Sequence, residues 1–170
     1  MQNTQSTEVY GKERASRYDQ FASVTMGDRK RQRSYLQDLL HRQPLAHGAF
    51  LDLGCGTGFF SEVLFEHRPD FNGHLVDGSA DMLELARQRV QKDGRRASLQ
   101  HALFDAIDWP ALPVFDVVFS GYAIHHLSDA AKWTLFGNIH ASLGPGGAFI
   151  LFDNFLPRQP DDRDLIEFLT

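Results

Sequence analysis

The sequence predicts an α/β domain with a doubly wound, mainly parallel sheet and helices on both faces, which makes three layers. Short apolar runs alternate along the chain with segments whose apolar residues recur at helical spacing. This alternation is typical of parallel strands joined by crossover helices. The first apolar run also ends in a glycine-rich loop, residues 54–58, where sheets of this kind bind their ligands.

The first half of the chain supplies two helices and two strands. After a polar N-terminal arm, apolar residues at helical spacing predict a helix at about residues 28–43. The apolar run 49–53 predicts the first strand, and residues 73–77 the second. Between them, residues 57–68 form a predicted helix that places these apolar side chains along one side: Phe59, Phe60, Val63 and Leu64.

The alternation continues to residue 119. Ser79 is a suitable N-cap for a helix that buries apolar residues and stops before Asp93. A third strand is predicted at 97–101, and the strongly apolar run 115–119 predicts a fourth. Four strand candidates separated by helical or irregular segments imply parallel pairing.

One more helix and strand complete the expected core. Ser128 would cap a helix that runs to about residue 143 and is ended by the glycine-rich segment 144–147. Residues 148–152 predict a fifth strand, and 161–170 a short helix. The side chains expected on the packed face of the helix after Ser128 are Trp133, Phe136, His140 and Leu143.

Length and composition predict one domain. A chain of 170 residues, 42% of them hydrophobic, can bury one continuous core. We expect residues 1–46 to form a helical arm or lid, 47–153 a ligand-binding core and 154–170 a short C-terminal segment. The polar N-terminus lacks the apolar stretch of a signal peptide, and no run approaches the roughly 18 apolar residues of a membrane span.

Charge and cysteine content narrow the classes of partner. The formal net charge of −5 provides no positive field for phosphate backbones, so we expect no nucleic-acid partner. Cys55 is the only cysteine, which excludes an internal disulfide and a cage of thiolate metal ligands and fits the reducing cytoplasm. The basic cluster at 29–33 is interpreted as a solvated helix face, with an anionic partner or substrate as the alternative.

The glycine loop argues against a dinucleotide ligand. Its glycines allow a tight turn and let a ligand touch backbone N–H groups. The dinucleotide fingerprint requires a third glycine at position 59, where this chain has Phe59. That ring would obstruct the close approach of helix and pyrophosphate, which disfavours nicotinamide and flavin dinucleotides.

The segment LDLGCGTG at residues 51–58 resembles the first motif of the Rossmann-like S-adenosylmethionine-dependent methyltransferases. The resemblance implies that Asp52 holds the amino group of the cofactor directly or through water. A carboxylate at the end of an apolar strand is costly to desolvate unless a cation or donors meet it, and capping of its own loop is the alternative role. The loop residues implied to line the methionine portion are Gly54, Cys55, Gly56 and Gly58.

Residues 75–79 resemble the second motif of the family. By that resemblance, Asp77 accepts hydrogen bonds from both ribose hydroxyls, and Gly78 next to it also contributes to cofactor binding. A helix N-cap is the alternative role of Asp77, although Ser79 is better placed for it. Met82 resembles the apolar residue beside the adenosine, with core packing as the alternative.

Residues 102–106 resemble the place where the family recognises adenine with an acidic side chain and the next backbone N–H. These groups would be Asp105 and Ala106. Asp108 is a rival for the acidic role, and an ordinary surface loop is the alternative interpretation.

Methyl transfer from a sulfonium is an in-line displacement, so the protein mainly aligns the reactants and excludes water. Residues 120–127 resemble the motif beside the methyl group, where the backbone of Ser120 would contact the methionine portion. His125 or His126 could act as general base, and orientation or packing is the alternative. No further ligand stands at helical spacing from them, so we expect no metal site.

The N-terminal arm resembles the segment that closes over the cofactor in small-molecule members of the family. The resemblance rests on Tyr18-Asp19 followed by Phe21. Tyr10 and Tyr18 are therefore candidates for the acceptor pocket, with simple aromatic packing as the alternative.

The resemblance extends from residue 18 to 153. Members usually continue into further helices and an antiparallel strand pair, which we expect this chain to lack; a complete protein and a fragment of a longer one both stay open. The strand at 148–152 would be an apolar edge, so we expect the C-terminal helix or a second copy of the chain, in a homodimer, to cover it.

Three functions are consistent with these observations. The leading hypothesis is methyl transfer from S-adenosylmethionine to a small-molecule acceptor. A binding module without transfer activity and an enzyme that uses the sulfonium for different chemistry are the alternatives. Methylation of nucleic-acid amino groups calls for Asn or Asp followed by two prolines after the fourth strand, whereas this chain reads Ser-Gly-Tyr-Ala at 120–123.

Overall fold

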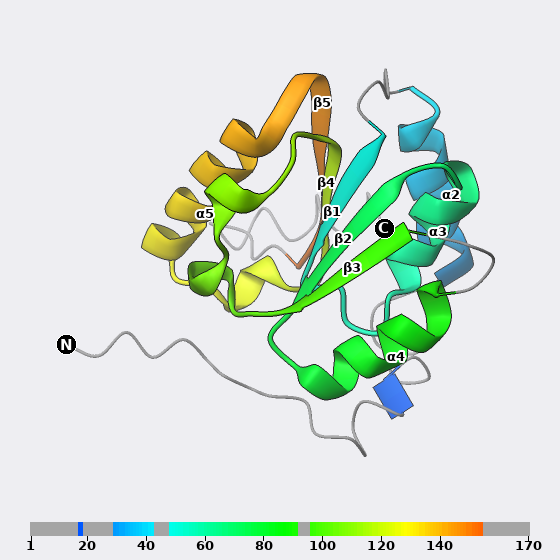
Figure 1. Cartoon of the computed structure of the whole chain (residues 1–170), viewed down its shortest axis with the longest axis horizontal. Helices are drawn as coiled ribbons and strands as arrows, with labels where there is room; N and C mark the ends of the chain where they lie inside the picture. Colours follow the sequence, from blue (N-terminus) through cyan, green and yellow to red (C-terminus); the bar gives the residue numbers. More distant parts are fainter. Residues whose placement is uncertain (1–16, 19–28, 43–47, 92–95, 155–170) are drawn as a thin grey trace, which may run out of the picture.

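A single sheet of five parallel strands organises the structure (Figure 1). The computed structural model describes residues 17–18, 29–42, 48–91 and 96–154. The strand order is β3-β2-β1-β4-β5, which confirms the doubly wound sheet. The strands are β1 (Ala49–Leu53), β2 (Asn72–Asp77), β3 (Arg96–His101), β4 (Phe115–Gly121) and β5 (Leu143–Phe152).

Helices cover both faces of the sheet and complete three layers (Figure 1). One face carries α2 (Arg29–Leu40), α3 (Phe59–His67) and α4 (Ala80–Val90), and the other carries α5 (Asp129–Ser142). Successive side chains of β1 point to opposite faces, so Phe50 packs with the first group of helices and Leu51 with α5. Three 3₁₀ turns follow the strands at the loop ends: η1 (Phe104–Ala106), η2 (Trp109–Ala111) and η3 (Ile124–His126).

The helix starts follow local backbone chemistry. Ser79 and Ser128 act as N-caps, since their hydroxyls accept from the N–H of Met82 and of Ala131, both at 3.3 Å. α3 begins at residue 59, two residues later than predicted, because Gly58 adopts a φ of +76° that a right-handed helix does not accommodate.

The buried face of α5 differs from the prediction. Leu135 and Ile139 point into the core, whereas Trp133 is 77% exposed and His140 is also exposed. Leu135 and Ile139 lie four positions apart and so form one stripe along the helix. The prediction that Trp133 lies on the packed face is wrong, because the large size of a side chain does not by itself place it on the buried side of a helix.

The fifth strand begins at Leu143, five residues before the predicted start at residue 148. Leu143 pairs with Phe115, and the pairing shifts register before Ala148 pairs with Val117. The glycine-rich segment 144–147 bulges out between these two pairings, with Gly146 at a φ of +80°, and regular pairing with β4 runs from Ala148 to Phe152. The helix expected at 161–170 lies outside the described residues.

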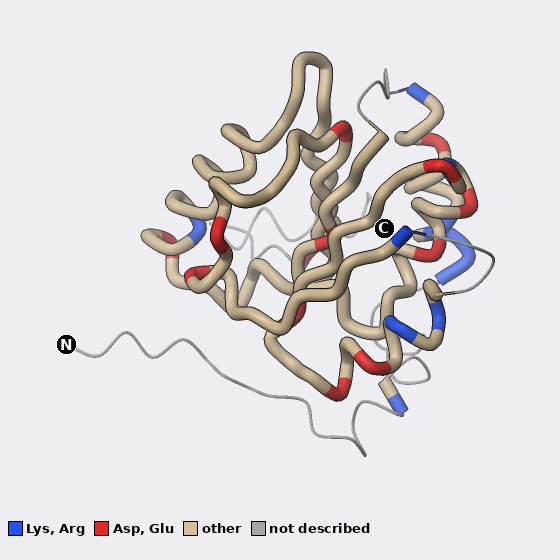
Figure 2. Tube along the Cα trace, in the orientation of Figure 1, with Lys and Arg blue, Asp and Glu red and all other residues tan. Residues whose placement is uncertain are grey.

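The basic cluster of α2 is engaged within the molecule. Arg33 forms ion pairs with Glu62 and Glu66 of α3, and the guanidinium of Arg29 lies 4.5 Å from the ring centroid of Phe59. Figure 2 shows the Lys and Arg segments of α2 beside the acidic segments of α3. Arg29 and Arg33 therefore pack against α3, and only the exposed Lys30 and Arg31 fit the interpretation as a solvated helix face.

Among the described residues, no helix has both the length and the apolar character that crossing a membrane requires.

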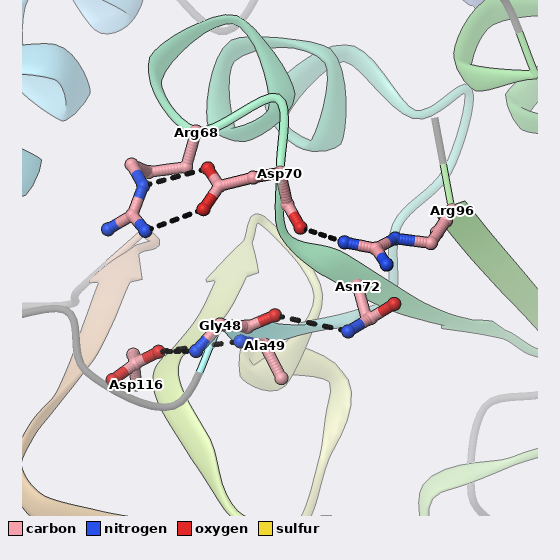
Figure 3. A network of polar contacts seen from close by, with 7 residues as sticks. All are labelled: Gly48, Ala49, Arg68, Asp70, Asn72, Arg96 and Asp116. Carbon is pink, nitrogen blue, oxygen red and sulfur yellow. Dashed lines mark hydrogen bonds and ion pairs between the residues drawn. The ribbon is translucent and has the colours of Figure 1, made fainter. Parts of the chain in front are cut away.

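A polar network holds the strand starts together at the edge opposite the glycine loop (Figure 3). The side chain of Asp116, on β4, accepts from the N–H of Gly48 at 2.7 Å and of Ala49 at 3.4 Å. Because Asp116 is buried, its carboxylate needs hydrogen-bond donors, and these two backbone N–H groups at the start of β1 supply them. Nearby, Arg68 holds the exposed carboxylate of Asp70 through two hydrogen bonds at 3.0 and 2.9 Å.

Replacement of Asp116 should destabilise the fold more than replacement of Asp70. Asp116→Ala leaves two N–H donors at the start of β1 without their acceptor, which should cost about 2–3 kcal/mol of unfolding free energy. Asp70→Ala removes only a solvent-screened ion pair and should cost less. The urea midpoint of each variant, compared at an unchanged m-value, measures its loss of unfolding free energy. Equal losses in the two variants would contradict the structural role of Asp116.

Candidate functional site

The glycine loop turns sharply at the carboxyl end of β1. Gly54, Gly56 and Gly58 have φ angles of +71°, +53° and +76°, in the left-handed region that favours glycine. The N–H groups of Gly54 and Cys55 both donate to the carbonyl of Val76 on β2, at 2.8 and 3.1 Å. The turn therefore joins the carboxyl ends of β1 and β2.

Glycine is also required at this turn for space. A Cβ atom on Gly54 would lie 2.4 Å from the Cβ of Ala123, in the segment after β4. The order of the strands reverses between β1 and β4, which is where open α/β sheets bind ligands. A Cβ atom on Gly56 would lie 3.9 Å from Cε1 of Tyr18, so this tyrosine of the N-terminal arm lies over the loop. Tyr10 lies outside the described residues.

Asp77, the last residue of β2, ties the glycine loop to the start of α4. One carboxylate oxygen accepts from the N–H of Gly56 and the other from the N–H of Ser79, both at 2.8 Å. Burial raises the pKa of Asp77, and the two backbone hydrogen bonds oppose that rise. Because each carboxylate oxygen can accept a second hydrogen bond, Asp77 retains capacity for a ligand.

Asp52 lies within β1 and is 1% exposed. Its carboxylate accepts from the hydroxyl of Ser61, on α3, at 2.5 Å. Burial, and to a smaller extent the charge of Asp77, raise the pKa of Asp52 to about 7, although the Ser61 hydrogen bond lowers it. A buried carboxyl beside a second carboxylate favours a cationic ligand, whose charge would stabilise the ionised form.

Cys55 occupies the loop as a buried thiol. Burial, followed by the charges of Asp52 and Asp77, raises its pKa well above the ordinary value. The thiol form is therefore favoured, and the thiolate needed for a nucleophile is not.

The candidate adenine residues lie in η1. Asp105 and Ala106 are exposed, and the N–H of Ala106 donates to the carbonyl of Leu103 at 3.0 Å. Leu103 also borders Gly78, where a Cβ atom would meet its Cδ2 at 2.9 Å. Met82 is 2% exposed, so its side chain is enclosed by the protein.

Phe104 brings η1 to the glycine loop. A Cβ atom on Gly54 would lie 3.4 Å from Cζ of Phe104. The candidate residues after β1, β2, β3 and β4 therefore meet at the same edge of the sheet.

The segment after β4 is anchored to two neighbouring strands. The hydroxyl of Ser120 donates to the carbonyl of Leu53 at 2.8 Å, so this buried side chain joins β4 to β1. Tyr122 has a φ of +57°, and its N–H donates to the carbonyl of Phe152 at 2.7 Å. A non-glycine residue in this conformation is held against a local energy cost, as is frequent beside functional sites.

The two histidines of η3 differ in their contacts. Nδ1 of His125 lies 2.5 Å from Oδ1 of Asp153, and the N–H of His125 donates to Oδ2 at 3.0 Å. The ring of His126 lies 4.0 Å from that of His125, centroid to centroid. Among the described residues, no three His, Cys, Asp or Glu side chains gather as metal ligands would.

Three residues of the site were not predicted from the sequence. Ser61 and Gln32 have no motif that marks them, although Gln32 donates to the hydroxyl of Tyr122 at 2.9 Å across 90 positions of sequence. Asp153 could have been found, because it directly follows an apolar strand, as Asp77 closes one.

Comparisons with known proteins agree with this geometry. A family model described as a methyltransferase domain matches residues 50–147. Trans-aconitate 2-methyltransferase of Pseudomonas aeruginosa is 35% identical over 133 residues, which are 78% of this chain and 43% of that protein. Demethylmenaquinone methyltransferase of Leptospira interrogans is 32% identical over 126 residues, 72% of this chain and 49% of that protein.

A solved structure shares the fold. The amino pentose methyltransferase CalS10 of Micromonospora echinaspora, solved with S-adenosylmethionine bound, aligns with a TM-score of 0.67 at 24% identity over 84% of this chain and 58% of that one. The chain spans less than half the length of the curated relatives that it matches. The family model covers more than half of the chain, and the chain therefore belongs to the methyltransferase domain family, with the Rossmann-like fold of the S-adenosylmethionine-dependent enzymes.

Proposed function

We propose that this chain binds S-adenosylmethionine at the carboxyl ends of β1 and β2 and transfers its methyl group to a small-molecule acceptor. The observation that carries the proposal is the pair of carboxylates around the glycine loop. Asp77 is held by backbone donors on both sides, and Asp52 is buried beside Ser61. Family membership and the S-adenosylmethionine bound to CalS10 support the same ligand.

The residues at this edge fit the parts of that ligand. Asp77 would accept from the ribose hydroxyls, and Asp52 would meet the positively charged amino group directly or through water. The backbone of Gly54, Gly56 and Gly58 would line the methionine portion, because a glycine loop lets a ligand touch backbone N–H groups. Asp105, exposed on η1, would accept from the exocyclic amine of adenine.

The chain's own residues would mainly position the reactants. When bound, S-adenosylmethionine supplies a methyl group on a positively charged sulfur. Tyr18 over the loop, with Tyr10 further along the arm, would border the acceptor and exclude water. The printed names of the relatives, which include trans-aconitate and demethylmenaquinone, support a small-molecule acceptor.

Two further proposals concern partners and location. The net charge of −5 supports the absence of a nucleic-acid partner, and the single cysteine supports a reducing, cytoplasmic environment. β5 is the last strand of the described sheet. A second copy of the chain paired along β5 would cover this apolar edge in a homodimer.

The transfer step distinguishes this function from its alternatives. Isothermal titration with S-adenosylmethionine tests binding, and release of S-adenosylhomocysteine with a panel of small acceptors tests transfer. Tight binding without release would favour a binding module, and consumption of the sulfonium without methylated product would favour different chemistry. Absence of binding at millimolar concentration would refute all three functions.

Asp77→Ala should weaken the affinity for S-adenosylmethionine on the order of 100-fold, because two charge-assisted hydrogen bonds to the ligand are lost. Glu84→Ala is the matched control, since it removes a carboxylate from the exposed side of α4. Its affinity should stay near that of the unmodified chain in isothermal titration. Equal losses in both variants would point to net charge instead of direct contact.

Gly54→Ala should abolish measurable binding of S-adenosylmethionine, because its new methyl group would overlap the side chain of Ala123. Gly48→Ala is the control: Gly48 has a similar φ of +74°, but among the described residues no atom beyond its chain neighbours lies within 4 Å of its Cβ position. Both variants carry the same backbone strain, so only the first should lose binding. Retained binding in Gly54→Ala would show that the close approach is unnecessary.

Binding should release a proton below neutral pH. The pKa of Asp52 is about 7 in the ligand-free chain, so at about pH 6 most of this carboxyl is protonated, and a cationic amino group would displace the proton. The calorimetric enthalpy at this pH should therefore differ between buffers of different ionisation enthalpy. Asp52→Asn should reduce that difference, and identical enthalpies in the unmodified chain would contradict the prediction.

A further inference from the structure

One buried carboxylate makes two contacts with the same histidine. Oδ1 of Asp153 lies 2.5 Å from Nδ1 of His125, and Oδ2 accepts from the backbone N–H of His125 at 3.0 Å. The side chain of Asp153 is 3% exposed, whereas that of His125 is 29% exposed. Asp153 is therefore enclosed, and His125 carries the surface of the pair that a ligand can reach.

The pair lies beside the glycine loop. Asp153 directly follows Phe152, which pairs with Gly121 of β4 and accepts from the N–H of Tyr122. His125 follows the segment whose Ala123 borders Gly54. The strands β1, β4 and β5 thus bring the pair to the edge at which we propose that the methyl donor binds.

The contacts select one tautomer of His125. An ionised carboxylate only accepts hydrogen bonds, so the nitrogen that faces Asp153 must carry the proton. Nδ1 is then the donor, and in the neutral ring Nε2 keeps its lone pair. The ring of His126, 4.0 Å away, further limits the orientations open to His125.

We infer that Asp153 is a positioning residue that holds His125 with Nε2 as the general base, and that the acceptor is a group that must lose a proton, such as a hydroxyl. This inference rests on the proposed function. Nε2 accepts the proton of the acceptor O–H while the oxygen bonds to the methyl carbon. The carbon–sulfur bond breaks, its electron pair stays on the sulfur as a neutral thioether, and the imidazolium returns the proton to solvent.

This substrate class differs from that of a carboxylate acceptor. A carboxylate is already ionised near neutral pH and attacks a methyl group without a base. An Asp-His pair would add nothing to that reaction, whereas a hydroxyl acceptor gains from removal of its proton. The pair therefore favours hydroxyl compounds over carboxylates such as trans-aconitate.

A purely structural role for Asp153 would also account for its contact with the backbone of His125. In that case the carboxylate would only hold η3 against β5, and the tautomer of the ring would have no effect on turnover. The two roles predict different results for Asp153→Asn, because an amide can keep the backbone contact through its oxygen while its NH₂ group faces Nδ1.

The test compares Asp153→Asn and His125→Asn with Asp129→Asn and His140→Asn, which alter exposed residues at the start and in the last turn of α5. Transfer from S-adenosylmethionine is measured with catechol and 1-naphthol as hydroxyl acceptors and with trans-aconitate as the carboxylate. Titration with S-adenosylhomocysteine and thermal unfolding check binding and folding. The ¹⁵N shifts of the neutral His125 ring report its tautomer.

We expect Asp153→Asn and His125→Asn to lower kcat for hydroxyl acceptors on the order of 100-fold or more. KM and the affinity for S-adenosylhomocysteine should change less than about threefold, well under the tenfold that 1.4 kcal/mol represents. His125 should show the Nδ1–H tautomer in the unmodified chain and lose it in Asp153→Asn. Asp129→Asn and His140→Asn should leave all readouts unchanged.

Specific results would overturn the inference. Unchanged kcat in Asp153→Asn, an unchanged tautomer, or transfer to trans-aconitate but to neither hydroxyl acceptor would each do so. If the chain binds S-adenosylmethionine but methylates none of the three compounds, the proposed transfer fails in this panel together with the proposed substrate class. The tautomer measurement then still decides, separately, whether Asp153 positions His125.

Discussion

The close approach of the glycine loop to the segment after β4 is the constraint on which the site depends. Gly54 turns at a φ of +71° with no room for a Cβ atom beside Ala123. That turn directs the N–H groups of Gly54 and Cys55 to the carbonyl of Val76, so the ends of β1 and β2 are joined directly. Without this approach, the residues after β1, β2 and β4 would not share one edge of the sheet.

Besides the exposed Asp105, three carboxylates of the described residues gather at that edge, and the protein stabilises each differently. Asp77 accepts two backbone hydrogen bonds, Asp153 contacts His125 twice, and Asp52 has the hydroxyl of Ser61. Burial raises the pKa of Asp52 to about 7 although hydrogen bonds from Ser61 oppose the rise, and a cationic ligand would stabilise the ionised form of this carboxyl.

The opposite edge of the sheet uses similar groups for stability. Asp116 is as buried as Asp52, but it accepts from the backbone of Gly48 and Ala49 at the start of β1. Arg68 and Asp70 form their ion pair on the exposed side of the same edge. In this parallel sheet the stabilising polar contacts lie where the strands begin, and the candidate binding groups lie where the strands end.

The sequence by itself determined the strands, the helix caps and the glycine loop, because these depend on neighbours along the chain. Apolar periodicity located β1 to β4, and Ser79 and Ser128 marked two helix starts. The motif around residues 51–58 also indicated the family before any contact was known.

Only the tertiary structure decided how distant residues meet. Pairing with β4 decided that β5 begins at Leu143, and packing of α5 on the sheet decided that Trp133 is exposed. The Asp153 to His125 contact spans 28 positions, and the Gln32 to Tyr122 contact spans 90. Such pairs are fixed by the twist and register of the sheet, for which a single sequence carries no local signal.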